Sequence, residues 1–191
     1  MKITSAQFIK GIRGTDPILE DGVPQIAFVG RSNVGKSSIV SALIDKKAKV
    51  KISDRPGKTT EINFFKVNES FYFVDLPGYG YARLSPDERE KLRKLIAWYL
   101  GASNAKPEVV LVILDAKAGL TDFDRQMIDI LNENEHPHFV VLNKVDKLSQ
   151  KELGEQLREI RTVVDEDQIV LSSTVAPGGM DALRKALFTD E

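Results

Sequence analysis

The stretch QIAFVGRSNVGKSS, residues 25–38, decides the fold of this chain. Residues Gly30–Ser37 fit the pattern G-x-x-x-x-G-K-[ST], directly after an apolar strand candidate and at the start of an amphipathic helix. Glycines let backbone N–H groups wrap around phosphates, and a helix N-terminus adds the positive end of its dipole. We therefore expect Lys36 to reach the β- and γ-phosphates of a nucleotide and the Ser37 hydroxyl to bind Mg²⁺.

Apolar runs of strand length alternate with amphipathic helical stretches along the chain. The predicted strands are residues 25–29, 61–67, 71–75, 109–115, 139–142 and 168–171. Asn68-Glu69-Ser70 is short enough to join the second and third strands as an antiparallel hairpin, whereas the others are separated by helices, as parallel neighbours require. Val109–Leu114 is apolar throughout, which is typical of a strand buried on both faces.

The predicted helices begin near Lys36, Ser85, Thr121, Ser149 and Met180. Ser85 and Ser149 each precede a glutamate by three residues, the pattern of a capping box. This alternation predicts an α/β domain with the three-layer P-loop NTPase fold. We expect a mostly parallel six-stranded sheet with one antiparallel strand and helices on both faces.

The composition is that of one globular domain: 191 residues, 42% hydrophobic and 29% charged, with a formal net charge of −1. The absence of cysteine excludes disulfide scaffolds, thiol catalysis and cysteine-bound zinc or iron–sulfur sites. The longest apolar run is far shorter than the about 20 residues of a membrane helix, and the N-terminus lacks the apolar core of a signal peptide. We expect a cytoplasmic protein with no membrane partner.

Positive charge is concentrated in the first third of the chain. Residues 1–60 carry 11 Lys and Arg against 5 Asp and Glu, and residues 46–58 alone hold six basic residues and one Asp. Such a run is either a solvated loop or a surface that meets the phosphates of a nucleotide or of RNA. Both interpretations stay open at this point.

The segment Asn143-Lys144-Val145-Asp146, at the end of a predicted strand, distinguishes among nucleotides. The Asp146 carboxylate can accept hydrogen bonds from N1–H and the exocyclic amine of guanine together, whereas adenine lacks that pair of donors. The Asn143 amide can serve the other polar edge of the base, and the Lys144 stem can lie along the ring. After a phosphate-binding loop, this segment indicates guanine.

Three further segments follow strand ends or precede strands. Asp75-Leu76-Pro77-Gly78 would hold Mg²⁺ through water at Asp75 and contact the γ-phosphate through the Gly78 amide. A threonine of Pro56-Gly57-Lys58-Thr59-Thr60 could complete the magnesium shell only when the γ-phosphate is present, which would make this loop a switch. Ser172-Ser173-Thr174 is either a backbone loop over the guanine or an ordinary turn before a helix.

Together these segments identify the chain as similar to the EngB (YihA/YsxC) family of ribosome-assembly GTPases, within the TrmE–Era–EngA–EngB group of translation-factor-like GTPases. The strings that carry the resemblance are GRSNVGKSS at 30–38, PGKT at 56–59, INFF at 62–65 and DLPGYGYA at 75–82. The resemblance covers nearly the whole chain, with residues 1–22 as an N-terminal extension packed on a single EngB-type G domain, 1–191. Relatives often carry threonine in place of Asn143, but asparagine is the commoner GTPase form.

The resemblance implies Mg²⁺ held by Ser37, Thr59 and, through water, Asp75, and it assigns catalysis to Lys36, Thr59 and the Gly78 amide. The implied GTP contacts are Gly30, Arg31, Ser32, Asn33, Val34, Gly35, Lys36, Ser37, Ser38, Gly57, Lys58, Thr59, Thr60, Glu61, Asp75, Leu76, Pro77, Gly78, Asn143, Lys144, Val145, Asp146, Ser172, Ser173 and Thr174. Asn33 matches an asparagine that holds K⁺ in similar GTPases, so we hypothesise a potassium ion there in place of an arginine finger. Tyr79 stands where many GTPases place a water-orienting glutamine, and we expect slow intrinsic hydrolysis.

The function implied is a monomeric GTP-hydrolysing switch in large (50S) ribosomal subunit assembly, linked to normal cell division and septation, with GTP or GDP, rRNA and ribosomal proteins as partners. One alternative is a GTP-gated RNA or protein binding module with negligible hydrolysis, and another is a P-loop ATPase or nucleotide kinase. His136 and His138 flank a proline without further ligands, so we do not expect a metal there. Asp115 and Asp122 are better explained by a strand end and a helix cap than by paired catalytic carboxylates.

Overall fold

The sheet has eight strands in the computed structural model, which describes residues 1–44, 49–51, 60–80 and 84–188. The strands are β1 (Ser5–Ile12), β2 (Gln25–Gly30), β3 (Lys49–Lys51), β4 (Ile62–Val67), β5 (Phe71–Asp75), β6 (Val109–Asp115), β7 (His138–Asn143) and β8 (Ile169–Ser172). Their order is β3-β1-β4-β5-β2-β6-β7-β8. Of these strands β4 alone runs antiparallel to its neighbours, so the prediction of a mostly parallel sheet with one antiparallel strand is confirmed.

The predicted number of six strands was wrong, because β1 and β3 were missed. β1 comes from the N-terminal segment and pairs with β4, with a register shift between Phe8 and Lys10. This irregularity interrupts the period-two pattern by which a strand is recognised. β3 is only three residues long and pairs in parallel with the start of β1, so it is too short to carry a pattern.

Five α-helices cover the sheet: α1 (Lys36–Leu43), α2 (Pro86–Ala97), α3 (Asp122–Glu133), α4 (Gln150–Ile160) and α5 (Asp181–Leu187). A π-helical turn (Trp98–Ala102) extends α2, and single 3-10 turns lie at Pro17–Leu19, Val145–Lys147 and Glu166–Gln168. The predicted capping boxes at Ser85 and Ser149 are present, and Thr121 forms a third with Asp124. The helix starts read from the sequence are therefore confirmed.

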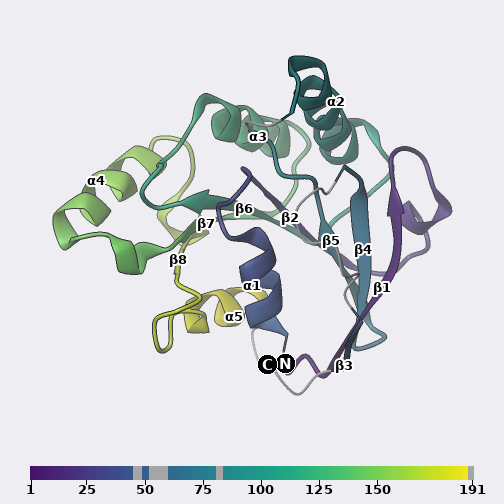
Figure 1. Cartoon of the computed structure of the whole chain (residues 1–191), viewed down its shortest axis with the longest axis horizontal. Coiled ribbons are helices and arrows are strands. Elements are labelled where there is room, and N and C mark those ends of the chain that lie inside the picture. Colours follow the sequence, from purple (N-terminus) through teal and green to yellow (C-terminus); the bar gives the residue numbers. More distant parts are fainter. Residues whose placement is uncertain (45–48, 52–59, 81–83, 189–191) are drawn as a thin grey trace.

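The helices form two layers, one on each face of the sheet (Figure 1). Buried residues of α2, α3 and α4 pack with Ala27 and Val29 of β2, whereas those of α1 and α5 pack with Ile26 and Phe28. Alternate side chains of one strand thus enter two cores, which is why β2 and most of β6 are buried on both sides. The predicted three-layer fold is confirmed.

The parallel strands end at one edge of the sheet, and this places the functional segments together. Phe28 pairs with Asp75, and Asp115 lies in register with Asn143, which in turn pairs with Ser172. Ligands of open α/β sheets bind beyond these carboxyl ends. Within the described residues, no helix is both long and apolar enough to cross a membrane.

Candidate nucleotide-binding site

The phosphate-binding loop connects β2 to α1 and is pressed against the neighbouring strands. A Cβ atom at Gly30 would overlap the Ile113 carbonyl oxygen of β6. Gly35, which has a φ of 99°, precedes the first turn of α1, and a Cβ there would overlap the Asn143 amide. Gly30 is therefore required by the close approach of a neighbouring backbone, and Gly35 by its positive φ and by the Asn143 side chain.

Asn143 joins the phosphate-binding loop to the last two strands. Its buried side chain donates from Nδ2 to the Val34 carbonyl oxygen at 2.8 Å. Its Oδ1 accepts a hydrogen bond from the Ser172 hydroxyl at 3.2 Å. Three segments that were predicted separately from the sequence thus meet in one buried polar contact.

Lys144 makes a second bridge to the same loop. The residue adopts a left-handed conformation, and its Nζ donates to the Asn33 carbonyl oxygen at 2.6 Å and to Asp115 Oδ2 at 2.7 Å. Partial burial acts to raise the pKa of the Asp115 carboxyl, but hydrogen bonds from Lys144 and from the Lys117 and Ala118 amides outweigh it, so this pKa lies below its usual value. Asp115 is thus a support for Lys144 that was not predicted, although its place at a strand end at this edge was the available signal.

Asp146 is hydrogen-bonded to the serine-rich segment that follows β8. The Ser173 hydroxyl, itself buried, donates to Asp146 Oδ1 at 2.6 Å while the Asp146 residue stays exposed. Ser173 Oγ also accepts from the Val175 and Ala176 amides, so the hydroxyl direction is fixed by its own turn. This arrangement presents a carboxylate of fixed orientation to two adjacent donors, which is what guanine offers and adenine lacks.

Lys36 and Asp75, the two charges predicted to face phosphate and magnesium, pair with each other. Lys36 Nζ donates to Asp75 Oδ1, and the two side chains are only 9% and 13% exposed. Opposite charges this well buried stabilise one another only while both remain in place. A ligand anion that contacted Lys36 would therefore compete with Asp75 for it.

The segment after β5 lies directly on the phosphate-binding loop. The Ser32 amide donates to the Tyr79 carbonyl oxygen at 2.7 Å, and Arg31 and Tyr79 form a parallel bridge. A Cβ atom on Gly78 would come within 3.3 Å of the Ser32 backbone, which shows how closely the two chains approach. The Gly78 amide is thus brought to the loop where the γ-phosphate is expected.

The side chain of Tyr79 points away from this loop into the core. It is only 3% exposed, its ring centroid lies 4.3 Å from that of Phe123, and its hydroxyl donates to the buried Asp124 carboxylate. Burial, followed by the charge of Asp124, raises the pKa of Tyr79 far above its usual range. A phenol committed in this way cannot orient an attacking water, in agreement with the reason given for expecting slow hydrolysis.

Thr60 and Glu61 contact the N-terminal segment. Arg13 donates to Thr60 Oγ1 at 2.9 Å and lies 3.2 Å from Glu61 Oε1. Arg13 was not predicted, because only the tertiary fold places the end of β1 beside this loop. The predicted Gly57, Lys58 and Thr59, together with Tyr81 and Ala82 of the DLPGYGYA string, lie outside the described residues, as does the 46–58 run except for 49–51.

Donors for a magnesium ion fit those of a nucleotide-dependent site. The described residues contain no group of three or more His, Asp or Glu side chains that could hold a metal alone. Ser37 lies exposed in the first turn of α1, and the Asp75 carboxylate is paired with Lys36, the residue before Ser37. The ring nitrogens of His136 and His138 lie beside backbone carbonyl oxygens, at 2.6 and 2.9 Å. The hydroxyl, carboxylate and phosphate oxygens together suit Mg²⁺, which prefers a few protein ligands plus substrate phosphates.

Comparison with known proteins agrees with this geometry. The family model described as "50S ribosome-binding GTPase" matches residues 25–144, and one described as "Elongation factor Tu GTP binding domain" matches 100–189. A probable GTP-binding protein EngB of Chlorobaculum parvum is 40% identical over 190 residues, covering 98% of this chain and 97% of that protein. The chain belongs to the EngB family of GTPases. It binds GTP or GDP and hydrolyses GTP.

Further relatives support the EngB assignment by sequence and by structure. The protein of the same name from Chlorobium luteolum is 42% identical over 158 residues, 83% of this chain and 76% of the relative. The crystal structure of a probable GTP-binding protein engB superposes with a TM-score of 0.72 at 26% identity, over 86% of this chain and 96% of that one. Era in complex with MgGDPNP and nucleotides 1506–1542 of 16S rRNA gives a TM-score of 0.61 at 25% identity, over 86% of this chain and 55% of Era.

Proposed function

We propose that this GTPase is a nucleotide-controlled switch that assists assembly of the large (50S) ribosomal subunit in the cytoplasm, and that normal cell division and septation depend on it. The observation that carries the proposal is the match of residues 25–144 to the family described as 50S ribosome-binding GTPases. That range runs from the start of β2 to Lys144 and so includes the phosphate-binding loop. The likeness to Era, solved with a 16S rRNA fragment, supports an RNA partner in the same group of GTPases.

The chemistry proposed is in-line attack of water on the γ-phosphate, with catalysis by positioning and charge stabilisation. Lys36 leaves Asp75 to neutralise the phosphates, and the Gly78 amide donates to the γ-phosphate. Ser37 and Thr59 would hold Mg²⁺, and Asp75 would act on it through water. When bound, the metal would neutralise phosphate charge.

A potassium ion at Asn33 is proposed to supply the charge that an arginine finger gives elsewhere. Asn33 is exposed and has a φ of 69°, and its backbone carbonyl oxygen is bonded to Lys144, so the proposed cation ligand is the side-chain amide oxygen. GTP hydrolysis, with and without ribosomal subunits, should be faster in KCl than in NaCl. Equal rates in the two salts under both conditions would remove this proposal.

The basic run 46–58 overlaps the proposed switch loop, 56–60, and ends beside Thr59. We propose that nucleotide state controls how this positive charge meets rRNA. The protein is proposed to act as a monomer and as one G domain, 1–191, with the extension 1–22 packed on it. The pairing of β1 with β4 supports that packing.

The test is sedimentation of the purified protein with 50S particles in three states: nucleotide-free, GDP and a non-hydrolysable GTP analogue. We expect co-sedimentation that is strongest with the GTP analogue and that weakens as salt is raised. Parallel tubes with 30S particles control for general RNA affinity. Equal binding in all three states, or equal binding to both subunits, would contradict the proposal.

The alternative of a GTP-gated binding module with negligible hydrolysis is favoured by one observation, the burial of Tyr79 away from the phosphates. Multiple-turnover assays with purified large subunits separate the two. Stimulated turnover supports the switch, whereas binding without turnover supports the module. An ATPase or nucleotide kinase would instead show competition by ATP.

A further inference from the structure

We propose that Tyr79 is a positioning residue for GTP hydrolysis, because its hydroxyl anchors the Gly78–Tyr79 backbone to the first turn of α3 and so sets where the Gly78 amide meets the γ-phosphate. The inference rests on the role proposed for Gly78. It assigns to Tyr79 a task different from that of the glutamine found there in many GTPases. The hydroxyl acts through the backbone and not on the attacking water.

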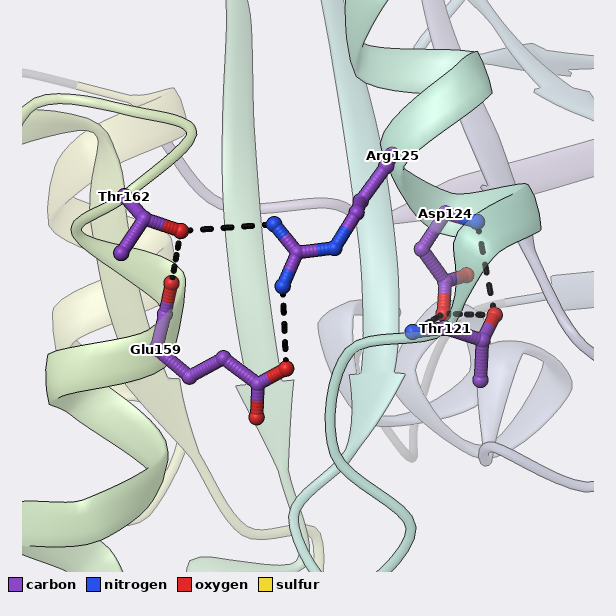
Figure 2. Close-up of polar contacts among 5 residues, drawn as sticks. All are labelled: Thr121, Asp124, Arg125, Glu159 and Thr162. Carbon is purple, nitrogen blue, oxygen red and sulfur yellow. Dashed lines mark hydrogen bonds and ion pairs between the residues drawn. The ribbon is translucent and has the colours of Figure 1, made fainter.

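The acceptor of this hydrogen bond, the Asp124 carboxylate, is held in place by contacts that do not involve Tyr79. Asp124 is fully buried, and its Oδ2 accepts from the Thr121 amide at 2.9 Å and from the Thr121 hydroxyl at 2.6 Å (Figure 2). These bonds form the capping box of α3. They occupy Oδ2 alone, so Oδ1 is free to accept the Tyr79 hydroxyl, and it does. The Asp124 carboxylate thus caps the start of α3 with one oxygen and accepts from Tyr79 with the other.

The helix that carries this acceptor is itself held in place. Arg125, next to Asp124, donates to Glu159 Oε1 at 3.0 Å and to the Thr162 hydroxyl at 3.3 Å, which ties α3 to α4 and the turn after it (Figure 2). Buried Met127, Ile128 and Leu131 fix α3 on the sheet. An anchor point on α3 is therefore a stable reference for the segment after β5.

The other end of the anchored residue touches the phosphate-binding loop. The Tyr79 carbonyl oxygen accepts the Ser32 amide at 2.7 Å, and the Gly78 amide is one residue earlier in the chain. One residue thus links the first turn of α3 to the loop through its side chain and its backbone. Two hydrogen bonds therefore hold Tyr79, one from its hydroxyl to Asp124 and one from the Ser32 amide to its carbonyl oxygen. We infer that a shift of the Tyr79 ring also shifts the adjoining Gly78 peptide.

Packing alone does not account for the hydroxyl. The ring of Tyr79 lies against Phe123, which is covered by Arg93 with its guanidinium carbon 4.8 Å from the Phe123 centroid. Phenylalanine would preserve the ring contact without the cost of burying a polar group. A buried hydroxyl paired with a buried carboxylate specifies one position of the ring, and we infer that this position is what the reaction requires.

The experiment compares Tyr79→Phe with Tyr72→Phe. The Tyr72 hydroxyl also donates to a carboxylate, Asp21, at 2.8 Å, but in the loop before β2, so it is a matched control. The readouts are kcat and KM for GTP and the affinities for GDP and a non-hydrolysable GTP analogue, measured with fluorescent nucleotides. We expect Tyr79→Phe to lower kcat and affinity for the GTP analogue by about tenfold each, with GDP affinity within about twofold, since the lost bond is to a charged group. Tyr72→Phe should change none of these.

A second pair keeps the test independent of folding defects. Asp124→Asn can keep its oxygen on the Thr121 amide and donate from its Nδ2 to the Tyr79 hydroxyl oxygen, so a side-chain hydrogen bond to Tyr79 is retained, whereas Asp124→Ala removes it. The kcat should therefore be higher in the asparagine variant when both are measured below their thermal transitions. Equal loss of GDP and GTP-analogue affinity, or a lowered Tm with unchanged kcat, would overturn the inference in favour of a structural role. If the unaltered protein neither hydrolyses GTP nor distinguishes its analogue from GDP, the role proposed for Gly78 is wrong. That result differs from failure of the Tyr79 inference alone, in which the unaltered protein behaves as proposed and only the variants do not.

Discussion

The two ends of the nucleotide site are built differently. At the base end, Asn143, Lys144 and Asp146 are each held by a residue outside the guanine segment: by Val34, Asp115 and Ser173, respectively. At the phosphate end, Lys36 and Asp75 hold each other, and both are the groups proposed to contact the ligand.

This difference separates recognition from switching. A base can bind at the preorganised end with little rearrangement. Differences in hydrogen bonding between bases therefore appear directly as differences in binding affinity. Under the proposed function, phosphates and Mg²⁺ would instead exchange the Lys36–Asp75 pair for new partners. We therefore expect ligand binding at that end to alter the contacts of Asp75, the last residue of β5. The four predictions below test this contrast, beginning with the largest effect.

The largest expected effect is a change of base specificity in Asp146→Asn. An amide offers the acceptor and donor pattern that xanthine needs and opposes the two adjacent donors of guanine. We expect the ratio of guanine to xanthine nucleotide affinity to fall by about 10³-fold, since a site that leaves buried polar groups unpaired rejects its ligand strongly. Competition titrations with GDP and XDP measure this. An unchanged ratio would contradict the assignment of Asn143, Lys144 and Asp146 to guanine recognition.

The second prediction concerns the Lys36–Asp75 pair in the absence of nucleotide. Lys36→Met should destabilise the protein by about 3 kcal/mol because Asp75 is left buried and unpaired, whereas the double variant Lys36→Met, Asp75→Ala should regain much of that loss. Urea unfolding measures the cycle. The partly exposed pair Lys10–Asp16, at 2.7 Å, is the control and should couple much more weakly. A Lys36–Asp75 coupling no larger than the control would mean that the pair is easily exchanged.

The contrast also explains what could be predicted from the sequence. Strands β5 to β8 each have an apolar run that ends in a polar residue, as at Val74–Asp75 and Leu142–Asn143. This local pattern is enough to predict that the ends of these strands lie at one edge of the sheet. The phosphate-binding glycines were likewise predictable, because their backbone requirement is local. The structure brings these segments together as the strand order requires.

Other features depend on contacts between distant segments. The irregular strand β1 and the three-residue β3 leave no periodic signal, so two strands were missed. Asp124 has the sequence signature of a helix cap and nothing more, and its second oxygen becomes important only because Tyr79 folds over it. Arg13 is a solvated charge until β1 brings it to Thr60. Such pairings cannot be inferred without the fold.

The third prediction is a moderate loss at the base end that is equal for both nucleotides. Ser173→Ala removes the hydroxyl that orients Asp146, and we expect about tenfold weaker binding of GDP and of a GTP analogue alike, since one hydrogen bond to a charged group is lost. Ser70→Ala, whose hydroxyl bonds a hairpin carbonyl away from the site, is the control. Isothermal titration measures both nucleotides. A selective loss of the GTP analogue would mean that the two ends are not independent, contrary to the separation argued above and unlike the pattern expected for Tyr79→Phe.

The smallest expected effect is a pH dependence of stability from Asp115. Its folded-state pKa lies below the ordinary value of 3.8, so the stability it contributes is present above about pH 4 and is lost as the pH falls through the folded-state pKa. Asp115→Asn should therefore lower the free energy of unfolding by less than about 1 kcal/mol at pH 7, because the pair with Lys144 is partly solvated, and the difference should shrink at pH 3. Asp129→Asn, an exposed position on α3, is the control. If the Asp115→Asn difference were the same at pH 3 and pH 7, the carboxylate charge would not be what holds Lys144 on the phosphate-binding loop, and the preorganisation of the base end would have to come from Asn143 and Ser173 alone.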